Sequence, residues 1–211
     1  IVGPNGAGKT TTMNVISGFL TSQGGRVRVG DTDLLDLPPY RRTRWGLRRS
    51  FQRDEIAGDL TVEENLRAML DNLPLSRADK REELARALDF TGLGAERHRL
   101  GATLNSYDRR LTDVARCVIG RPKMILFDEP AGGLTGEETE HLGALILAIP
   151  GQTGAQVLVI DHDVDLISRI CSQTLVLDFG RRIAFGPTAA VFDDPAVKAA
   201  YLGLEAEDAG A

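Results

Sequence analysis

A phosphate-binding pattern stands at the start of the chain. It follows G-x-x-x-x-G-K-[ST] from Gly3 to Thr10, after two apolar residues. Glycines in such a loop let backbone N–H groups converge on phosphate oxygens, and the lysine reaches the β- and γ-phosphates. The alternative is a glycine-rich turn with a chance lysine, but a helical pattern over residues 11–19 would aim its positive N-terminus at the same anion. We expect a nucleoside triphosphate site made by Gly3, Pro4, Asn5, Gly6, Ala7, Gly8, Lys9, Thr10 and Thr11, with the Thr10 hydroxyl on Mg²⁺.

A second cluster follows an apolar run. Residues 124–127 are all apolar and lead directly into Asp128 and Glu129, which predicts a parallel strand buried on both faces. Ligands of such sheets bind beyond the carboxyl ends of the strands. Two carboxylates there could serve only solubility. Beside a phosphate loop they predict that Asp128 holds Mg²⁺ through water and that Glu129 is the general base that polarises the attacking water.

Two polar residues lie at related positions. His162 follows a second apolar strand, residues 157–160, and is the only one of three histidines at a predicted catalytic edge; an isolated histidine is otherwise more often structural. Gln52 follows Phe51, between the phosphate loop and the next helical block. A lone glutamine carries little weight by itself. In this position its amide is expected to ligate Mg²⁺ and to respond to the γ-phosphate.

Composition limits the classes of function. The chain has 211 residues, 42% of them apolar, and a net charge of −5 with 5% aromatic residues, which argues against a nucleic-acid partner. No apolar run reaches the length of a membrane span and no signal peptide is visible. Cys117 and Cys171 are expected to be small buried apolar groups in a reducing compartment. The first residue is Ile1, so we expect an N-terminal piece to be missing and the strand beside the phosphate loop to form an exposed edge.

Local signals predict the remaining elements. Capping boxes at Thr61/Glu64 and Thr135/Glu138 open helices, and Ser76 can cap another that extends through residues 79–90. No strand alternation occurs between residues 61 and 91, so this block is expected to be a helical insert. Further expectations are an edge strand at 27–29, a hairpin of 174–177 and 182–185 across Gly180, short helices at 187–192 and 195–201, and a frayed tail at 205–211.

A basic run follows a double proline at 38–39. We interpret it as a solvated helix face; a face near lipid headgroups or an acidic partner is the alternative. The run contains Arg41, Arg42, Arg44, Arg48, Arg49 and Arg53.

The order of these motifs resembles the ABC-transporter ATPase family. The resemblance covers nearly the whole chain, and within the family it is similar to the branched-chain amino acid importer type. The segments that carry this narrower resemblance are Phe51-Gln52, residues 60–65, His162-Asp163-Val164-Asp165, Leu177-Asp178-Phe179-Gly180 and Ala200-Tyr201-Leu202-Gly203. The resemblance implies an α/β P-loop NTPase core with a parallel sheet, an inserted helical subdomain and a C-terminal strand and helix extension. It also implies one domain over 1–211, with a catalytic core at 1–53 and 120–211 and the helical subdomain at about 54–119.

In that family two ATPase domains pair head to tail, and each ATP lies under the partner's signature motif, typically Leu-Ser-x-Gly-Gln. The matching segment here, the signature segment, departs from this motif, because Tyr107 replaces a glycine that must approach phosphate closely and Asp108 adds a negative charge. The defect should therefore weaken the partner's site. The segment that follows the acid pair also has Thr135 where the family commonly has aspartate, and the adenine-stacking aromatic residue is not found. The signature segment consists of Leu104, Asn105, Ser106, Tyr107 and Asp108.

The sequence thus predicts an ATP- and Mg²⁺-dependent ATP hydrolase subunit of an importer for branched-chain or related amino acids. The resemblance implies as partners a second ATPase subunit, transmembrane permease subunits and, indirectly, a solute-binding protein, with the chain on the cytoplasmic face of the cell membrane. Lys9, Gln52, Glu129 and His162 are the expected catalytic residues. Two alternatives stay open: an impaired nucleotide-binding subunit of a heterodimer, and a soluble ABC protein acting on DNA or ribosomes. The latter would normally carry a long coiled-coil insert or a second ATPase domain.

Overall fold

A parallel sheet lies at the centre of the computed structural model, which describes residues 1–52, 55–71 and 73–198. Its strands are β3 (Leu47–Arg49), β4 (Met124–Asp128) and β5 (Gln156–Ile160), in the order β3-β4-β5. All five residues of β4 are buried, as the apolar run predicted. The register pairs Asp128 with Ile160, so the carboxyl ends of β4 and β5 lie at one edge.

The segment before the phosphate loop joins this sheet to a C-terminal hairpin. Val2 is fully buried; its N–H donates to the Leu175 carbonyl and its carbonyl accepts from the Leu177 N–H, both at 2.9 Å. Ile1 N lies 2.6 Å from the Val159 carbonyl oxygen of β5. The hairpin, β6 (Gln173–Asp178) and β7 (Arg181–Pro187), is antiparallel as predicted. The phosphate loop therefore leaves the sheet between β5 and β6.

We expected the strand beside the phosphate loop to form an exposed edge, and in the structure this region borders a cleft. It has a volume of about 720 Å³ and lies between β5 and β6, with α6 along one side. Its lining includes Val157 and Leu158, which are half-buried. The strands flanking Ile1 are thus partly covered, and Val2 itself is not exposed.

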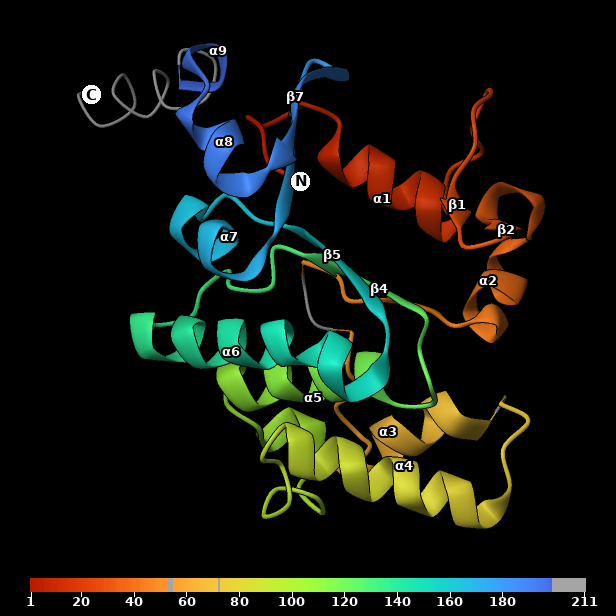
Figure 1. The fold of residues 1–211 in the computed structure, drawn as a ribbon. Helices are drawn as coiled ribbons and strands as arrows, with labels where there is room; N and C mark the ends of the chain where they lie inside the picture. Colours follow the sequence, from red (N-terminus) through yellow and green to blue (C-terminus); the bar gives the residue numbers. More distant parts are fainter. Residues whose placement is uncertain (53–54, 72, 199–211) are drawn as a thin grey trace.

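Helices cover both faces of the sheet, because successive residues of β4 face opposite ways. Ile125 and Phe127 belong to the core beneath α5 and α6, and Leu126 packs with Met13 and Ile16 of α1 on the other face (Figure 1). Helices α3, α4 and α5 also pack against one another. The helix bounds are α1 (Lys9–Ser17), α2 (Pro39–Trp45), α3 (Val62–Asp71), α4 (Arg77–Phe90), α5 (Ser106–Val118), α6 (Gly136–Thr153), α7 (Val164–Ile170), α8 (Thr188–Asp193) and α9 (Pro195–Val197).

The predicted helix starts are confirmed by side-chain caps. The Thr61 hydroxyl accepts from the Glu64 N–H, and the Glu64 carboxylate accepts from the Thr61 N–H at 2.8 Å. Reciprocal boxes also open α4 at Ser76/Asp79 and α6 at Thr135/Glu138. Thr135, which occupies the place of the family's aspartate, is therefore the N-cap of α6.

Several predicted bounds were wrong. The first helix covers residues 9–17 and not 11–19, because Gly18 takes φ 88° and its N–H returns to the Asn14 and Val15 carbonyls. Residues 28–33 form a small hairpin of β1 (Arg28–Val29) and β2 (Thr32–Asp33) followed by the 3-10 turn η1 (Leu34–Asp36), where only one strand was expected. Helix α7 and the 3-10 turn η2 (Gly101–Thr103) were not predicted. The end of the predicted helix at 195–201, the motif at 200–203 and the tail lie outside the described residues.

The interpretation of the basic run as a solvated helix face is also wrong for several of its members. Arg42 and Arg48 are only 6% and 3% exposed, and Arg49 belongs to β3 rather than to a helix. The Arg42 guanidinium donates to the carbonyls of Val15, Ile16 and Leu37. It thereby satisfies acceptors at the end of α1 that the helix itself leaves open. Arg41 and Arg44 are exposed as predicted, and Arg53 lies outside the described residues.

Both cysteines are free thiols within the described chain, as expected. Cys117 is buried and Cys171 is half-buried, and burial raises the pKa of each thiol above its ordinary value. In the described part of the chain, no helix combines the length and apolar character that a membrane crossing requires.

Replacing Arg42 tests the buried part of the basic run. Arg42→Met leaves three carbonyls without their donor, so it should lower the free energy of unfolding by about 2–4 kcal/mol. Chemical denaturation with urea measures this quantity. The matched change Arg41→Met, at an exposed position of the same helix, should alter it by no more than about 0.5 kcal/mol. Equal losses for the two variants would contradict the assignment.

Candidate functional site

The phosphate loop is shaped by glycines at two points. A Cβ at Gly3 would lie 2.1 Å from the Leu177 carbonyl oxygen, so only glycine permits the close contact with β6. Gly8 takes φ 97° directly before α1, where its backbone turns into the helix. The loop is also held from outside, because the Gly180 N–H in the β6–β7 turn donates to the Ala7 carbonyl at 2.9 Å. The loop and the hairpin tip lie side by side (Figure 1).

Lys9 is folded back into this loop. Its ammonium donates to the Gly3 carbonyl at 2.6 Å and to the Pro4 carbonyl at 3.0 Å. Burial lowers the pKa of Lys9, and the carboxylates of Glu129 and Asp128 act in the opposite direction. The positive charge therefore lies between the loop and the acid pair, which is the space that a phosphate chain must share.

The acid pair sits at the carboxyl end of β4, as the sequence predicted. Asp128 is 5% exposed, and its Oδ2 accepts a hydrogen bond from Arg49 at 3.0 Å. Glu129 takes φ 49°, an unfavourable conformation for a residue other than glycine, and its N–H donates to the Ile160 carbonyl at 2.7 Å. Backbone strain of this kind is often found at functional sites. Glu129 is thus fixed at the strand end beside β5.

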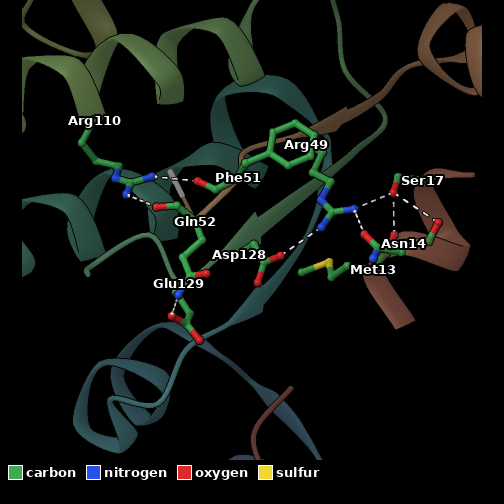
Figure 2. A network of polar contacts seen from close by, with 9 residues as sticks. All are labelled: Met13, Asn14, Ser17, Arg49, Phe51, Gln52, Arg110, Asp128 and Glu129. Carbon is green, nitrogen blue, oxygen red and sulfur yellow. Dashed lines mark hydrogen bonds and ion pairs between the residues drawn. The ribbon is translucent and has the colours of Figure 1, made fainter. Parts of the chain in front are cut away.

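Gln52 meets this acid pair. Its Nε2 donates to Glu129 Oε2 at 2.7 Å (Figure 2). Its backbone is held from α5, because the Arg110 guanidinium donates to the carbonyls of Phe51 and Gln52 at 3.2 and 3.1 Å. The structure therefore brings Lys9, Gln52 and the adjacent pair Asp128-Glu129 into one region from three separate parts of the sequence.

His162 lies at the same sheet edge, two residues beyond Ile160. Its side chain is 70% exposed, and Nδ1 is 3.6 Å from Asp161 Oδ1. Asp161 is buried and accepts hydrogen bonds from the N–H groups of Asp163 and Ala131. Asp161 thus ties the segment after Glu129 to the end of β5, next to the predicted γ-phosphate sensor.

The signature segment begins α5. The Asn105 side chain caps the helix by accepting from the Asp108 N–H at 2.7 Å, so the departure from serine keeps a good helix cap. Tyr107 is half-buried against α6, with its hydroxyl in contact with His141 Nδ1. Burial raises the pKa of Tyr107, helped by the carboxylates of Glu138 and Asp108. Of the other two members, Leu104 is buried and Ser106 is exposed.

Sequence reasoning missed Arg49, Arg110 and Asp161. A signal existed for Arg110, since it lies four and seven residues before Val114 and Cys117 and so shares the apolar face of α5. Asp161 directly follows the apolar run of β5, as Asp128 follows that of β4. Arg49 carried no comparable signal, because β3 has only three residues and two of them are arginines.

The residues present fit a magnesium ion that is bound mainly by phosphate. Mg²⁺ is usually held by one or two carboxylates plus substrate phosphates, and Thr10, Gln52 and Asp128 offer a hydroxyl, an amide and a single carboxylate. Among the described residues no group of three or more His, Cys, Asp or Glu side chains could hold a metal by itself. The site therefore fits a metal that arrives with a nucleotide.

A phosphate loop between parallel strands, with an acid pair at the end of a neighbouring strand, defines a P-loop NTPase. Residues 1–132 match the family model described as ABC transporter. The chain belongs to the ABC transporter family and is one of its ATP-binding, ATP-hydrolysing components. The predicted family and fold class are thereby confirmed.

The relatives are similar along nearly the whole chain. The branched-chain amino acid transport ATP-binding proteins BraF of Pseudomonas aeruginosa and LivG of Escherichia coli K12 are each 34% identical over 96% of this chain and 86% of the relative. The lipopolysaccharide export protein LptB of Haemophilus influenzae is 33% identical over 96% and 84%. Among solved structures, the ADP conformation of MJ1267, an ATP-binding cassette of an ABC transporter, has a TM-score of 0.80 at 28% identity over 96% and 86%.

Arg110 should control the position of Gln52. Arg110→Met removes the donor to two carbonyls, so we expect ATP hydrolysis to fall about 10-fold to 100-fold, because small displacements of a positioned group are costly. Hydrogen exchange in the peptide that contains Phe51 and Gln52 should become faster. The control Arg109→Met changes the neighbouring arginine, whose guanidinium donates to the Gly101 carbonyl. Unchanged exchange at residues 51–52 in Arg110→Met would argue against this role.

Proposed function

We propose that this chain is the ATP-binding and ATP-hydrolysing subunit of an ABC importer for branched-chain or related amino acids. The single observation that carries the ATPase part is the hydrogen bond from Gln52 to Glu129 at the carboxyl end of β4, at the sheet edge where the phosphate loop also leaves the sheet. Similarity to BraF and LivG over 96% of the chain supports the importer part. LptB is 33% identical over the same share, so identity alone does not choose the solute.

Each residue has a distinct role in this proposal. The loop N–H groups and Lys9 bind the phosphates, and Lys9 exchanges its two carbonyl partners for phosphate oxygens. Glu129 accepts a proton from the attacking water, and Gln52 holds the carboxylate of Glu129 until nucleotide enters. His162 contacts the γ-phosphate. Thr10, Gln52 and Asp128 would hold Mg²⁺, which would neutralise phosphate charge.

The proposed assembly extends the membership of this chain in the ABC transporter family. A second ATPase subunit supplies its signature segment to this chain's ATP, and permease subunits dock between the helical subdomain, about 54–119, and the region of Gln52 in the catalytic core, 1–53 and 120–211. The complex would work with a solute-binding protein and place this chain on the cytoplasmic face of the membrane. The names of BraF and LivG, which describe transport of branched-chain amino acids, support these partners.

The second candidate is a nucleotide-binding subunit that impairs its partner's site. It rests on the signature segment, where Tyr107 and Asp108 replace residues that approach phosphate. The meeting of Glu129, Gln52 and Lys9 favours an active site of the chain's own.

Glu129→Gln tests the general base. The amide oxygen can still accept from Gln52, so ATP affinity should change less than about 3-fold while hydrolysis falls at least about 100-fold. Phosphate release and equilibrium ATP binding by the full chain measure the two effects. Glu137→Gln, at an exposed acid of α6, is the matched control and should leave both unchanged. Undiminished phosphate release in Glu129→Gln would remove Glu129 from the mechanism.

Restoring the signature tests the second candidate. The double change Asn105→Ser with Tyr107→Gly removes the phenol that contacts His141 while serine can still cap α5. If the altered segment impairs the partner's site, hydrolysis at high protein concentration should rise about 10-fold or more, since close backbone approach becomes possible. The single change His141→Ala serves as a control for loss of the Tyr107 contact. An unchanged rate in the double variant would refute the impairment.

A further inference from the structure

The side chain of Arg49 is nearly buried and contacts residues of both β4 and α1. Its side chain is 7% exposed and reaches Asp128 Oδ2 from one terminal nitrogen, NH2, at 3.0 Å. The other terminal nitrogen, NH1, donates to Asn14 Oδ1 at 2.7 Å and to Ser17 Oγ at 2.8 Å on α1 (Figure 2). One guanidinium therefore joins the end of β4 to the helix that follows the phosphate loop.

The guanidinium plane is also fixed by aromatic rings. It lies 4.8 Å from the centre of the Phe51 ring and 5.7 Å from that of Phe19. The two rings meet edge to face at 5.8 Å. Such contacts favour arginine over lysine, because the planar guanidinium stacks on rings and offers a fork of donors.

The anchor points on α1 share a face with Thr10. Thr10, Asn14 and Ser17 are spaced by four and three residues, which places their side chains along one side of the helix. Thr10 and Asp128 are two of the three proposed Mg²⁺ ligands. Arg49 thus spans from one ligand to the helix face that carries the other.

We infer that Arg49 is a positioning residue: it fixes the spacing between the α1 face that bears Thr10 and the Asp128 carboxylate, and so sets the affinity for Mg²⁺ bound with ATP. Magnesium demands near-ideal octahedral geometry, so a small change in this spacing should weaken its binding. Arg49 bonds Oδ2 of Asp128, so Oδ1 is not engaged by this guanidinium. This inference rests on the Mg²⁺ assignment of the proposed function.

The charge of Arg49 and its positioning of Asp128 should affect the Mg²⁺ affinity in opposite directions, which makes the inference testable. A cation beside Asp128 repels Mg²⁺, so loss of the charge alone would tighten Mg²⁺ binding. Loss of the geometry would weaken it. Arg49→Lys keeps the charge and removes the simultaneous contacts to Asp128, Asn14 and Ser17. Arg49→Lys is therefore the informative change, and Arg49→Met is the charge control.

The experiment titrates Mg²⁺ into the full chain with ATP in the Glu129→Gln background, and also measures ATP affinity in EDTA. For Arg49→Lys we expect the Mg²⁺ midpoint to rise about 5-fold to 10-fold, with ATP affinity in EDTA within about 3-fold. The pair Asn14→Ala with Ser17→Ala keeps Arg49 and should raise the midpoint about 3-fold. Arg48→Lys is the matched control, because Arg48 is the neighbouring arginine of β3 and is also buried, but it donates to the Thr43 and Leu47 carbonyls. It should leave the midpoint unchanged.

Three results would overturn the inference. An unchanged midpoint in both Arg49→Lys and the α1 pair would show that the spacing does not matter. A lower midpoint in Arg49→Met with an unchanged one in Arg49→Lys would show that Arg49 acts only by its charge. Equal loss of ATP affinity with and without Mg²⁺ would show a purely structural role. If the chain without a change at Arg49 gains no ATP affinity from Mg²⁺, the metal assignment itself fails, and the inference fails with it.

Discussion

The site depends on the position of Val2 between β5 and β6. Its two hydrogen bonds to β6, and the bond from Ile1 to Val159, make the phosphate loop leave the sheet at a point surrounded by strand ends. Parallel strands end at one edge, so β4 and β5 bring Glu129 and His162 to the same place. Gly3 makes this possible, because any side chain there would overlap the Leu177 carbonyl. A short pairing thus places the anion-binding loop and the acids together.

Buried arginines form the second level of organisation. A buried charge is costly unless it is hydrogen-bonded, and each buried arginine of the basic run has partners of its own. Arg42 closes the end of α1, Arg48 binds carbonyls between α2 and β3, and Arg49 joins α1 to Asp128. These contacts explain how a three-residue strand with two arginines can lie beside the apolar β4. The guanidinium groups add polar contacts to the apolar packing of Met13 and Ile16 between α1 and the sheet.

The sequence was informative where the signal is local. The apolar run of β4, the helix caps at Thr61, Ser76 and Thr135 and the C-terminal hairpin were predicted correctly, because each depends on neighbouring residues. Motif spacing likewise placed Lys9, Asp128 and Glu129. Arg49 could not be placed, since its partner Asp128 lies 79 residues away and charge alone suggests solvent. For Arg110 the periodicity of α5 could have indicated burial, but its partners lie about 60 residues away and could not be predicted. Helix α7 was not predicted because it has only seven residues, too few for a clear apolar periodicity, although Asp163 caps it.

The start of α5 links the signature segment to Glu129, the proposed general base. Asn105 caps the helix, and Arg110, within the next turn, holds the carbonyls of Phe51 and Gln52. Gln52 in turn donates to Glu129. A helix is stiff over so short a distance, so a displacement of Tyr107 at its first turn moves Arg110 with it. In the proposed dimer, a change in the signature segment would therefore affect both nucleotide sites: the partner's ATP through the backbone of the segment, and this chain's ATP through Arg110 and Gln52.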